Sequence, residues 1–377
     1  MTGFAIRGWC PDAWRPMVAG DGLLVRVKPR LGRLTRAQLA ALGEAAAAYG
    51  NGLIDLTSRA NLQLRGVSEA GWPALLERLI ALDLVDADPE AEKRRTLLVA
   101  PEWLPGDDTH RIATDMLARL GDLPALPGKM GFVIDAGPAP LLADAPGDFR
   151  IERGRAGEVL LRADGRARGA PVEHGREAEA LVALAQWFVA SGGVAVGRMR
   201  RHAEALPAFA AGDRVPAAAA PSMRPGGHPL GGVVGLAFGQ IDAGAIARLL
   251  DHPFSAVRVT PWRSLLVEDV LPTDPALIAD PASPLLRTDA CVGAPACPQG
   301  QVETRDLARR LAPWVSGRLH VSGCAKGCAR ALPSEVTVTG RDRRYDLAFD
   351  ARADAPALHA GLSADALLSL FGSTDAA

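Results

Sequence analysis

The chain of 377 residues is poor in cysteine and contains no long apolar run. Its five cysteines are too few for a disulfide framework, so we expect reduced thiols, as in the cytoplasm. Residues 1–16 hold no apolar signal segment, and no stretch approaches the roughly 20 apolar residues of a membrane helix. The sequence therefore predicts a cytoplasmic protein that does not enter a membrane.

The chain also lacks a charge excess and nearly lacks lysine. A formal net charge of −1 gives no reason to expect nucleic acid as a partner. Lysine supplies four of the 42 basic residues, Lys28, Lys93, Lys129 and Lys326, and arginine supplies the rest. With so many arginines, their number indicates nothing about binding, and only their positions are informative.

What the chain does contain is enough apolar material for several domains, and an internal repeat. Its length predicts two to four domains, and 48% of its residues are hydrophobic. Residues 23–84 have the pattern of a strand, a helix capped by Thr35, one or two strands and a second helix. Residues 232–267 repeat the order of strand, capped helix and returning strand. This order predicts two half-domains paired about a pseudo-twofold axis, with a site between them.

The remaining segments are less regular. Between the repeats, the pattern predicts helices at 109–120 and 177–191, and strands at 132–136 and 157–162. Residues 203–227 are rich in Ala, Pro and Gly and resemble a linker. The C-terminal region has the pattern of a helix at 303–314 and strands at 319–321 and 336–338.

Four cysteines near the C-terminus form the strongest motif. The spacing is Cys291-x5-Cys297, then 26 residues, then Cys324-x3-Cys328. A [4Fe–4S] cluster needs four thiolates from converging loops, with small residues that let backbone N–H groups approach, and both loops are rich in Gly and Ala. Structural zinc fits the x5 spacing poorly, and four unrelated thiols are the remaining alternative. Cys10, outside the motif, is expected to be an ordinary thiol.

This cysteine spacing resembles the cluster signature of the sulfite and nitrite reductase superfamily. In its sirohaem members the last cysteine, Cys328 here, also bridges the cluster to the sirohaem iron. The segment Thr57-Ser58-Arg59-x-Asn61-x-Gln63-x-Arg65 resembles the strand that contacts the tetrapyrrole in that superfamily. The resemblance implies an α+β fold with duplicated ferredoxin-like half-domains and α/β cluster-binding domains.

The expected boundaries follow from the patterns and this resemblance. They are ferredoxin-like half-domains at 1–88 and 228–277, a sulfite-reductase-type α/β domain at 89–205, a linker at 206–227 and a cluster-binding domain at 278–377.

Within the superfamily, the chain resembles the precorrin-3B synthase family of aerobic cobalamin biosynthesis. The similar segments are Arg7-Gly8-Trp9-Cys10-Pro11, Gly20-Asp21-Gly22-Leu23-Leu24-Val25-Arg26, Pro127-Gly128-Lys129-x-Gly131-Phe132 and Arg258-x-Thr260-Pro261-Trp262-Arg263. Sirohaem reductases place a second lysine where this chain has Gly131, so one anion-binding charge is missing. This departure weakens the alternative of a sirohaem-dependent sulfite or nitrite reductase. A non-catalytic electron-transfer subunit is a second alternative.

The resemblance implies a monooxygenase that uses O2 and NADH to hydroxylate precorrin-3A at C20, with lactone formation. NADH would act through a separate electron-donor protein, because the glycine-rich segment 192–197 follows a helix and does not fit a dinucleotide fingerprint. A cluster with four cysteine ligands has no open position for O2, so a second centre is expected, mononuclear non-haem iron or sirohaem. The candidate histidines for iron are His202, His228, His252 and His320.

The substrate carries many carboxylates, which arginine binds in a bidentate manner. By family position, Arg59 and Lys129 are expected to be catalytic. Substrate contacts are expected from Arg65, Asn61, Gln63, Arg258 and Arg263. Lys326 and Arg330 flank the last two cysteines, where a cation would raise the cluster potential. The basic run from Arg198 to His202 is expected to be a solvated surface, with polycarboxylate binding as the alternative.

Overall fold

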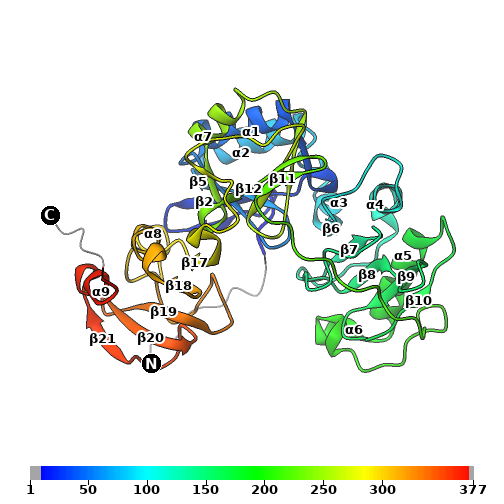
Figure 1. The fold of residues 1–377 in the computed structure, drawn as a ribbon. Coiled ribbons are helices and arrows are strands. Elements are labelled where there is room, and N and C mark those ends of the chain that lie inside the picture. Colours follow the sequence, from blue (N-terminus) through cyan, green and yellow to red (C-terminus); the bar gives the residue numbers. More distant parts are fainter. Residues whose placement is uncertain (1–9, 373–377) are drawn as a thin grey trace.

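The computed structural model describes residues 10–372 and has three parts (Figure 1). Two paired half-domains form the centre, a unit with α4 and α5 lies on one side, and the C-terminal unit with α8 and α9 lies on the other. The order of strands and helices agrees with the α+β class expected from the sequence.

The first half-domain consists of β1 (Met17–Ala19), β2 (Gly22–Val27), β3 (Arg33–Thr35), α1 (Arg36–Tyr49), β4 (Leu53–Leu56), β5 (Leu62–Val67) and α2 (Trp72–Ala81). The second consists of β11 (Gly226–His228), β12 (Gly231–Leu236), β13 (Gln240–Asp242), α7 (Ala243–Leu249), β14 (Ala256–Val259), β15 (Ser264–Glu268) and β16 (Leu277–Ile278). The two halves repeat the order of three strands, a helix and two strands, as the sequence pattern predicts, and they differ in the last element, α2 in the first and β16 in the second.

Backbone details confirm the duplication. Leu31 and Phe238 have positive φ angles of 53° and 59° in equivalent turns before the short strands β3 and β13. Ala60 and Arg263 lie at equivalent places in the β4–β5 and β14–β15 turns, which we call the returning turns, and have positive φ angles of 53° and 57°. Residues other than glycine rarely adopt a positive φ angle. The recurrence of such angles at matching positions therefore supports a true repeat.

The halves are joined by an exchange of strands. One sheet has the order β1-β2-β5-β4-β13, and the other has β11-β12-β15-β14-β3. Strand β13 of the second half pairs with β4 of the first, and β3 of the first half pairs with β14 of the second. Each half therefore completes the sheet of its partner, and neither sheet is contained within the expected boundaries 1–88 and 228–277.

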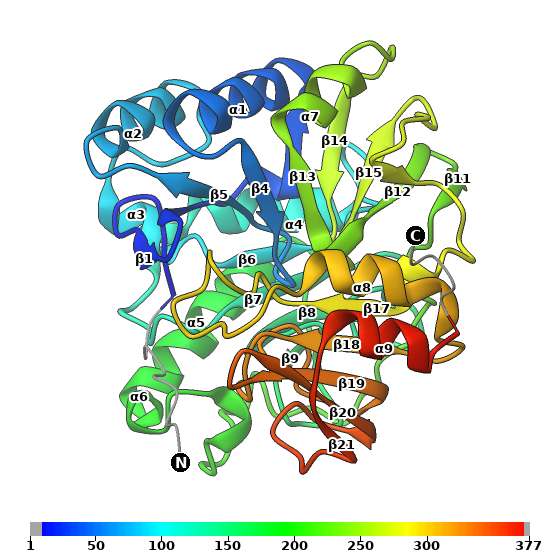
Figure 2. The same cartoon turned by 90° about the vertical axis from the view of Figure 1, so that its left-hand side faces the viewer.

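Helices cover one side of this pair of sheets (Figure 2). Thr35 begins α1 with a capping box, in which its side chain accepts from the backbone N–H of Gln38. Leu39, Leu42 and Ala46 of α1 are buried, as the period of the sequence predicts. Helix α7 lies directly against α1, because a Cβ at Gly43 would come within 2.9 Å of Ile246.

The second unit contains the sheet β10-β9-β8-β7-β6. Its elements are α3 (Pro89–Arg94), β6 (Leu97–Val99), α4 (Asp108–Ala118), β7 (Phe132–Asp135), β8 (Phe149–Arg153), β9 (Val159–Ala163), β10 (Ala170–Pro171), α5 (Glu177–Ala190) and α6 (Gly193–Val196). The segment expected to be a linker lies along this unit, with bridges from Pro216 to Gly154 and from Arg214 to Gly169.

The third unit contains the sheet β17-β18-β19-β20-β21. Its elements are β17 (Thr288–Ala290), α8 (Arg305–Leu311), β18 (Leu319–Ser322), β19 (Ser334–Arg341), β20 (Arg344–Ala351), β21 (His359–Leu362) and α9 (Ala364–Leu370). Strands β17 and β18 are parallel neighbours. Cys291 directly follows the first and Cys324 follows the second at a distance of two residues, so both cysteine loops begin at one edge of the sheet.

Several expected elements differ in extent. The returning strand predicted at the end of the repeat 232–267 is two strands, β14 and β15, because a tight turn with Arg263 at positive φ reverses the chain. The first strand of this repeat, β12, ends at Leu236. Phe238 lies in the turn that follows, because its positive φ angle of 59° does not fit a strand. The expected helix at 303–314 is shorter, since α8 ends at Leu311 and a 3-10 turn follows it. Within residues 10–372, no helix is long and apolar enough to cross a membrane.

A buried carboxylate reinforces the exchanged strand. Glu268 of β15 binds Arg33 of β3 through two bonds of 2.8 and 2.7 Å, and it binds Arg258 of β14 at 2.7 Å. Burial alone would raise the pKa of Glu268, but the bonds from Arg33, Arg258 and Ser255 outweigh it and lower that pKa to about 2. The ion pairs therefore stabilise the folded state.

We predict that Glu268→Gln lowers the free energy of unfolding by about 3 kcal/mol at pH 7, because the buried Arg258 and the half-buried Arg33 lose their anion. A carboxylate with a lowered folded-state pKa stabilises the fold above its unfolded pKa and loses this effect as the pH falls. The difference from the wild type should therefore shrink below about pH 4.5 and vanish near pH 2. Urea unfolding at several pH values measures both effects.

The matched control is Glu44→Gln, which removes the exposed ion pair with Arg78. Its cost should stay below about 1 kcal/mol at every pH. An equal cost for the two variants would show that Glu268 contributes no more than a surface charge.

Candidate functional site

The two cysteine loops pack directly against each other. The backbone N–H of Gly323 donates to Sγ of Cys291 at 3.1 Å, and the N–H of Gln301 donates to the Gly323 carbonyl at 2.8 Å. A Cβ at Gly323 would lie only 3.1 Å from Cα of Gly293 and 3.3 Å from Cα of Gly300. The small residues noted in the sequence therefore allow the two backbones to touch.

All four cysteines of the motif line one cavity of about 500 Å³, the cysteine cavity. Burial raises the pKa values of the Cys324 and Cys328 thiols, and the nearby Lys326 ammonium acts in the opposite direction. Among residues 10–372, no three His, Cys, Asp or Glu side chains gather around a single ion position. Two thiol pairs with a backbone donor between them fit a [4Fe–4S] cluster better than one zinc ion.

The first half-domain supports the first cysteine loop. The backbone N–H of Gly20, in the β1–β2 turn, donates to the carbonyl of Ala296 at 3.0 Å, and a Cβ at Gly20 would come within 2.7 Å of the Pro295 carbonyl oxygen. Asp21 in the same turn accepts two bonds from Arg65, at 2.9 and 3.0 Å. The turn is thus held between β5 and the cysteine loop.

Arg65 lines the cysteine cavity, but its guanidinium is already engaged. Besides Asp21, it binds Asp55 at 3.0 Å, and only 5% of its side chain is exposed. Asp55 also lies 3.5 Å from Arg305, a second, partly buried arginine of this cavity. Burial lowers the pKa of Arg305, while the nearby Asp55 and Cys291 raise it. Arg65 therefore stabilises the lining of the cysteine cavity through its two carboxylate partners. Arg305 places a cation beside Cys291.

The second half-domain contacts the C-terminal unit through Asp289 of β17, two residues before Cys291. Its carboxylate lies 2.7 Å from Arg263, 3.2 Å from Arg318 and 3.8 Å from Arg330. Arg263 also lines the cysteine cavity. This shared carboxylate connects the returning turn β14–β15 with the loop that follows Cys328.

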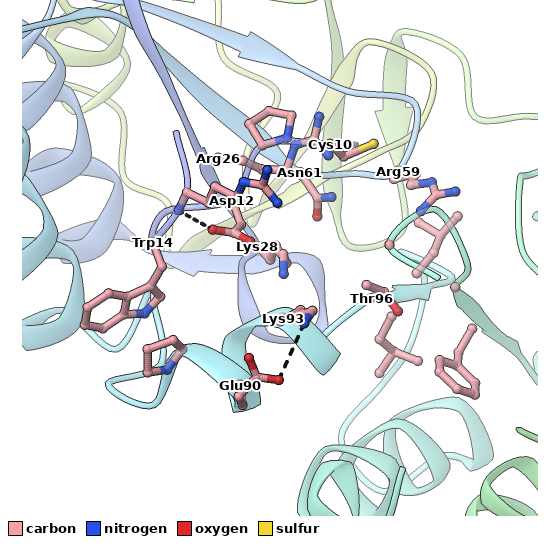
Figure 3. A pocket seen from close by; sticks show the side chains of 18 of the residues that line it. Cys10, Asp12, Trp14, Arg26, Lys28, Arg59, Asn61, Glu90, Lys93 and Thr96 are labelled. Carbon is pink, nitrogen blue, oxygen red and sulfur yellow. Dashed lines mark hydrogen bonds and ion pairs between the residues drawn. The ribbon is translucent and has the colours of Figure 1, made fainter. Parts of the chain in front are cut away.

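A second cavity of about 290 Å³, the basic cavity, lies between the first half-domain and the second unit (Figure 3). Its cationic lining residues are Arg15, Arg26, Lys28, Arg59 and Lys93, and its acidic ones are Asp12 and Glu90. Figure 3 shows Arg26, Lys28 and Asn61 grouped together, with Lys93 on α3 below them and Arg59 to one side. The excess of cations suits a ligand with several carboxylates.

One residue, Arg26, lines both cavities. Its Nη2 donates to Oε1 of Gln63 at 2.7 Å, across the paired strands β2 and β5. Leu23, Val25 and Val27 of β2 are buried in the core, so Arg26 lies on the opposite face of the strand. Asn61 and Gln63, two residues apart, line the basic cavity and the cysteine cavity respectively. The two cavities therefore adjoin along one face of the first sheet.

The two residues expected to be catalytic lie close together. Arg59 lines the basic cavity, and its Nη2 donates to the carbonyl of Lys129. The Lys129 side chain itself is exposed, while Gly128 and Gly131 of its loop line the cavity. The side chain of Arg59 therefore lies in the site. The loop of residues 128–131, the lysine loop, reaches the site through its glycine backbone.

Arg258, expected to contact substrate, lies elsewhere. It lines a separate cavity with Trp103 and His228, and it is 4% exposed. Its guanidinium binds Glu268, donates to the carbonyls of Pro101 and Trp103, and lies over the Trp103 ring at 4.1 Å. The contacts with Pro101 and Trp103 anchor the second half-domain to the second unit. Arg258 therefore has a structural position outside the two cavities described above.

The four candidate histidines lie in different parts of the fold. His202 bonds to Ser191, His228 to Glu102 and His252 to the Thr273 carbonyl. His320 is fully buried in β18, where burial lowers its pKa to about 4 and leaves it neutral. These positions, within the part of the chain that the structure describes, do not fit a facial triad for mononuclear iron.

Sequence reasoning missed several residues of the two cavities. Alternation along 23–28 could have placed Arg26 and Lys28 on the face away from the core. Cys10, expected to be an ordinary thiol, lines the basic cavity, whereas the preceding residues of its motif lie outside the described range. Lys93 and Arg305 carry no sequence signal, because α3 and α8 reach the cavities only through tertiary packing.

We predict that serine at Cys291, Cys297, Cys324 or Cys328 prevents stable incorporation of a [4Fe–4S] cluster, since each thiolate would bind one iron. After anaerobic reconstitution, iron and sulfide content and the absorbance near 400 nm, bleached by dithionite, should fall to background. Cys10→Ser is the matched control and should retain the full cluster content. A normal cluster in any of the four variants would contradict the assignment of that cysteine.

Comparison with known proteins agrees with this architecture. Residues 15–82 match the family model described as the nitrite/sulfite reductase ferredoxin-like half domain. A structure of the Mycobacterium tuberculosis NirA protein has a TM-score of 0.59 and 18% identity, and the match covers 92% of this chain and 79% of that one. This likeness concerns the fold.

Similarity in sequence is more specific. A ferredoxin–nitrite reductase from Synechococcus elongatus is 35% identical over 94 residues, which cover 25% of this chain and 18% of that protein. A precorrin-3B synthase from Sinorhizobium sp. is 32% identical over 387 aligned residues, covering 92% of this chain and 84% of the relative. The match of cysteine motif, duplicated fold and nearly full-length similarity shows that this chain belongs to the precorrin-3B synthase family.

Proposed function

We propose that the protein is a cytoplasmic precorrin-3B synthase, a monooxygenase that hydroxylates precorrin-3A at C20 with lactone formation, using O2 and NADH. The family relationship supports this substrate. The observation that carries the proposal is the contact between two cavities along one sheet face, with cysteine thiols lining one and cations lining the other.

The chemistry of the substrate matches this pair of cavities. A tetrapyrrole with several acidic side chains needs an extended surface and cations around its edge. The basic cavity offers Arg59, Lys28 and Lys93, while Asn61 and Gln63 offer amides on the adjoining strand. Because Arg26 lies at the junction, a ring bound there reaches from the basic cavity toward the four cysteines.

The charges of the site are arranged for binding carboxylates. Lys28 is buried, with its ammonium donating to the carbonyl of Glu92, and burial lowers its pKa. Lys93 forms a long pair with Glu90, whose carboxylate lies 3.6 Å from the ammonium, and both side chains are exposed. An arriving carboxylate would replace such a weak surface pair at little cost. We infer that Lys93 and Arg59 bind acidic side chains of the ring and orient C20.

Four cysteines of this chain would hold the cluster, which would supply single electrons when bound. NADH would provide two electrons for each turnover, through a separate donor protein. One atom of O2 would enter the new C–O bond, and the other would leave as water. The described histidines do not fit a mononuclear iron centre, so we assign no step to such a centre.

Turnover provides the direct test. The reconstituted protein, supplied with precorrin-3A, NADH, an electron-transfer partner and ¹⁸O2, should yield a product that contains one labelled oxygen atom. Arg59→Ala should weaken substrate binding about tenfold or more, because a charge-assisted hydrogen bond is worth about 1.5–3 kcal/mol. Mass spectrometry and initial rates at varied substrate concentration measure these outcomes.

A sirohaem-dependent reductase of sulfite or nitrite is the second candidate function, favoured by the similarity to a nitrite reductase and by the accessible Cys328 thiol in the cysteine cavity. A strong Soret band in the pure protein, together with sulfite or nitrite reduction by reduced methyl viologen, would support it and contradict our proposal. A loaded cluster without either activity would instead indicate an electron-transfer subunit.

A further inference from the structure

The basic run that follows α6 divides into inward and outward arginines. Arg200 pairs with Asp164 at 3.2 Å, and 63% of its side chain is exposed. Arg198 points inward, with 25% of its side chain exposed, and its Nη1 lies 3.1 Å from the carboxylate of Asp148. One member of the run is therefore built into the protein, while its neighbour remains at the surface.

The Lys129 carbonyl is the meeting point of two guanidinium groups. It accepts from Nη1 of Arg198 in the second unit and from Nη2 of Arg59 in the first half-domain. A single backbone oxygen thus connects two arginines from different parts of the fold. Within residues 10–372, the Arg59 side chain donates its hydrogen bond to this oxygen, and Arg59 lines the basic cavity.

Asp148 fixes the segments on both sides of this carbonyl. Its side chain is fully buried and accepts from the backbone N–H groups of Met199 at 3.0 Å and Gly131 at 3.2 Å. Its own backbone N–H donates to the Gly131 carbonyl at 2.7 Å. Asp148 therefore ties the lysine loop to the start of the basic run, and Arg198 completes the connection.

The positive charges of Arg59 and Arg198 lie close together at this connection. Two adjacent guanidinium groups repel each other, and burial together with Arg198 lowers the pKa of Arg59. The shared carbonyl and the buried Asp148 carboxylate offset this repulsion. Arg59 is consequently held at one place on the wall of the basic cavity, with its charge available to a ligand.

We propose that Arg198 is a positioning residue for substrate binding: with Asp148, it fixes the Lys129 carbonyl that in turn orients Arg59 toward a carboxylate of the bound tetrapyrrole. The inference rests on the proposed function. Arg198 is absent from the lining of the basic cavity, so it acts through Arg59 and not by touching the ligand.

The test uses the full-length, cluster-loaded protein with two ligands, precorrin-3A for turnover and uroporphyrin III as a stable polycarboxylate tetrapyrrole for binding. Fluorescence quenching gives the Kd, and initial rates give KM and kcat. The variants are Arg59→Ala, Arg198→Ala, Arg198→Lys, Asp148→Asn and the double variant Arg59→Ala with Arg198→Ala. Arg200→Ala is the matched control, since it removes a charge from the same run.

We expect Arg198→Ala to raise both Kd and KM about tenfold with little change in kcat, because a displaced Arg59 weakens binding rather than the chemical step. Arg198→Lys should recover part of the affinity by keeping the charge beside Asp148, and Asp148→Asn should resemble Arg198→Ala. The double variant should bind no more weakly than Arg59→Ala, since both changes remove one interaction. Arg200→Ala should bind as the wild type does.

Normal affinity in Arg198→Ala, with weak binding in Arg59→Ala, would overturn the positioning role and leave the proposed function intact. Additive losses in the double variant would also overturn it, because they would show independent contacts. An equal loss of affinity in Arg200→Ala would also overturn it, because the effect would then come from the general charge of the surface. If the wild type neither binds uroporphyrin III nor converts precorrin-3A, the proposed function fails, and the positioning role fails with it. Should Arg198→Ala not fold, Arg198→Lys decides by the same criteria.

Discussion

Reciprocal exchange of one short strand between the two half-domains is the constraint on which the rest of the structure depends. Because β3 completes the sheet of the second half and β13 that of the first, neither sheet forms without both halves. The ladder hydrogen bonds and the contact of α1 with α7 join segments about 200 residues apart in sequence. The pseudo-twofold pair is thus one rigid body, and it fixes where its two returning turns point.

The cysteine unit is anchored to that body by one turn of each half. From the first half, the β1–β2 turn contacts the backbone of the first cysteine loop and is held by Arg65 through Asp21. From the second half, Arg263 reaches Asp289 just before Cys291. The two supports come from turns that are not equivalent in the repeat, β1–β2 in the first half and β14–β15 in the second. One lies on the backbone of the loop, and the other is an ion pair at its base.

Most of the arginines with predicted roles turned out to act within the protein. Arg65 and Arg258 satisfy buried carboxylates, and Arg263 shares Asp289 with two further arginines. A buried guanidinium with such partners cannot also offer its full charge to a ligand. The cations that remain near the proposed substrate lie in the basic cavity, where Arg59 and Lys93 have weaker or backbone partners.

The sequence by itself determined the features that depend on local chemistry. The cysteine spacing, the cap at Thr35 and the alternation of β2 can each be recognised within a few residues, and the structure has the predicted cap and strand. The order of such patterns indicated the repeat, and the resemblance to the reductase superfamily implied the α+β class. Their recognition required no knowledge of distant contacts.

Only the tertiary structure decided which charges face one another. That Arg198 points inward while Arg200 does not depends on Asp148, which lies 50 residues away in sequence. The strand exchange, the packing of Arg258 against Trp103 of the second unit and the ion pair of Arg305 with Asp55 of the first half-domain likewise depend on contacts between parts of the fold. Arginine looks the same in a sequence whether it meets water or a buried carboxylate, because its free energy is set by partners that folding brings together.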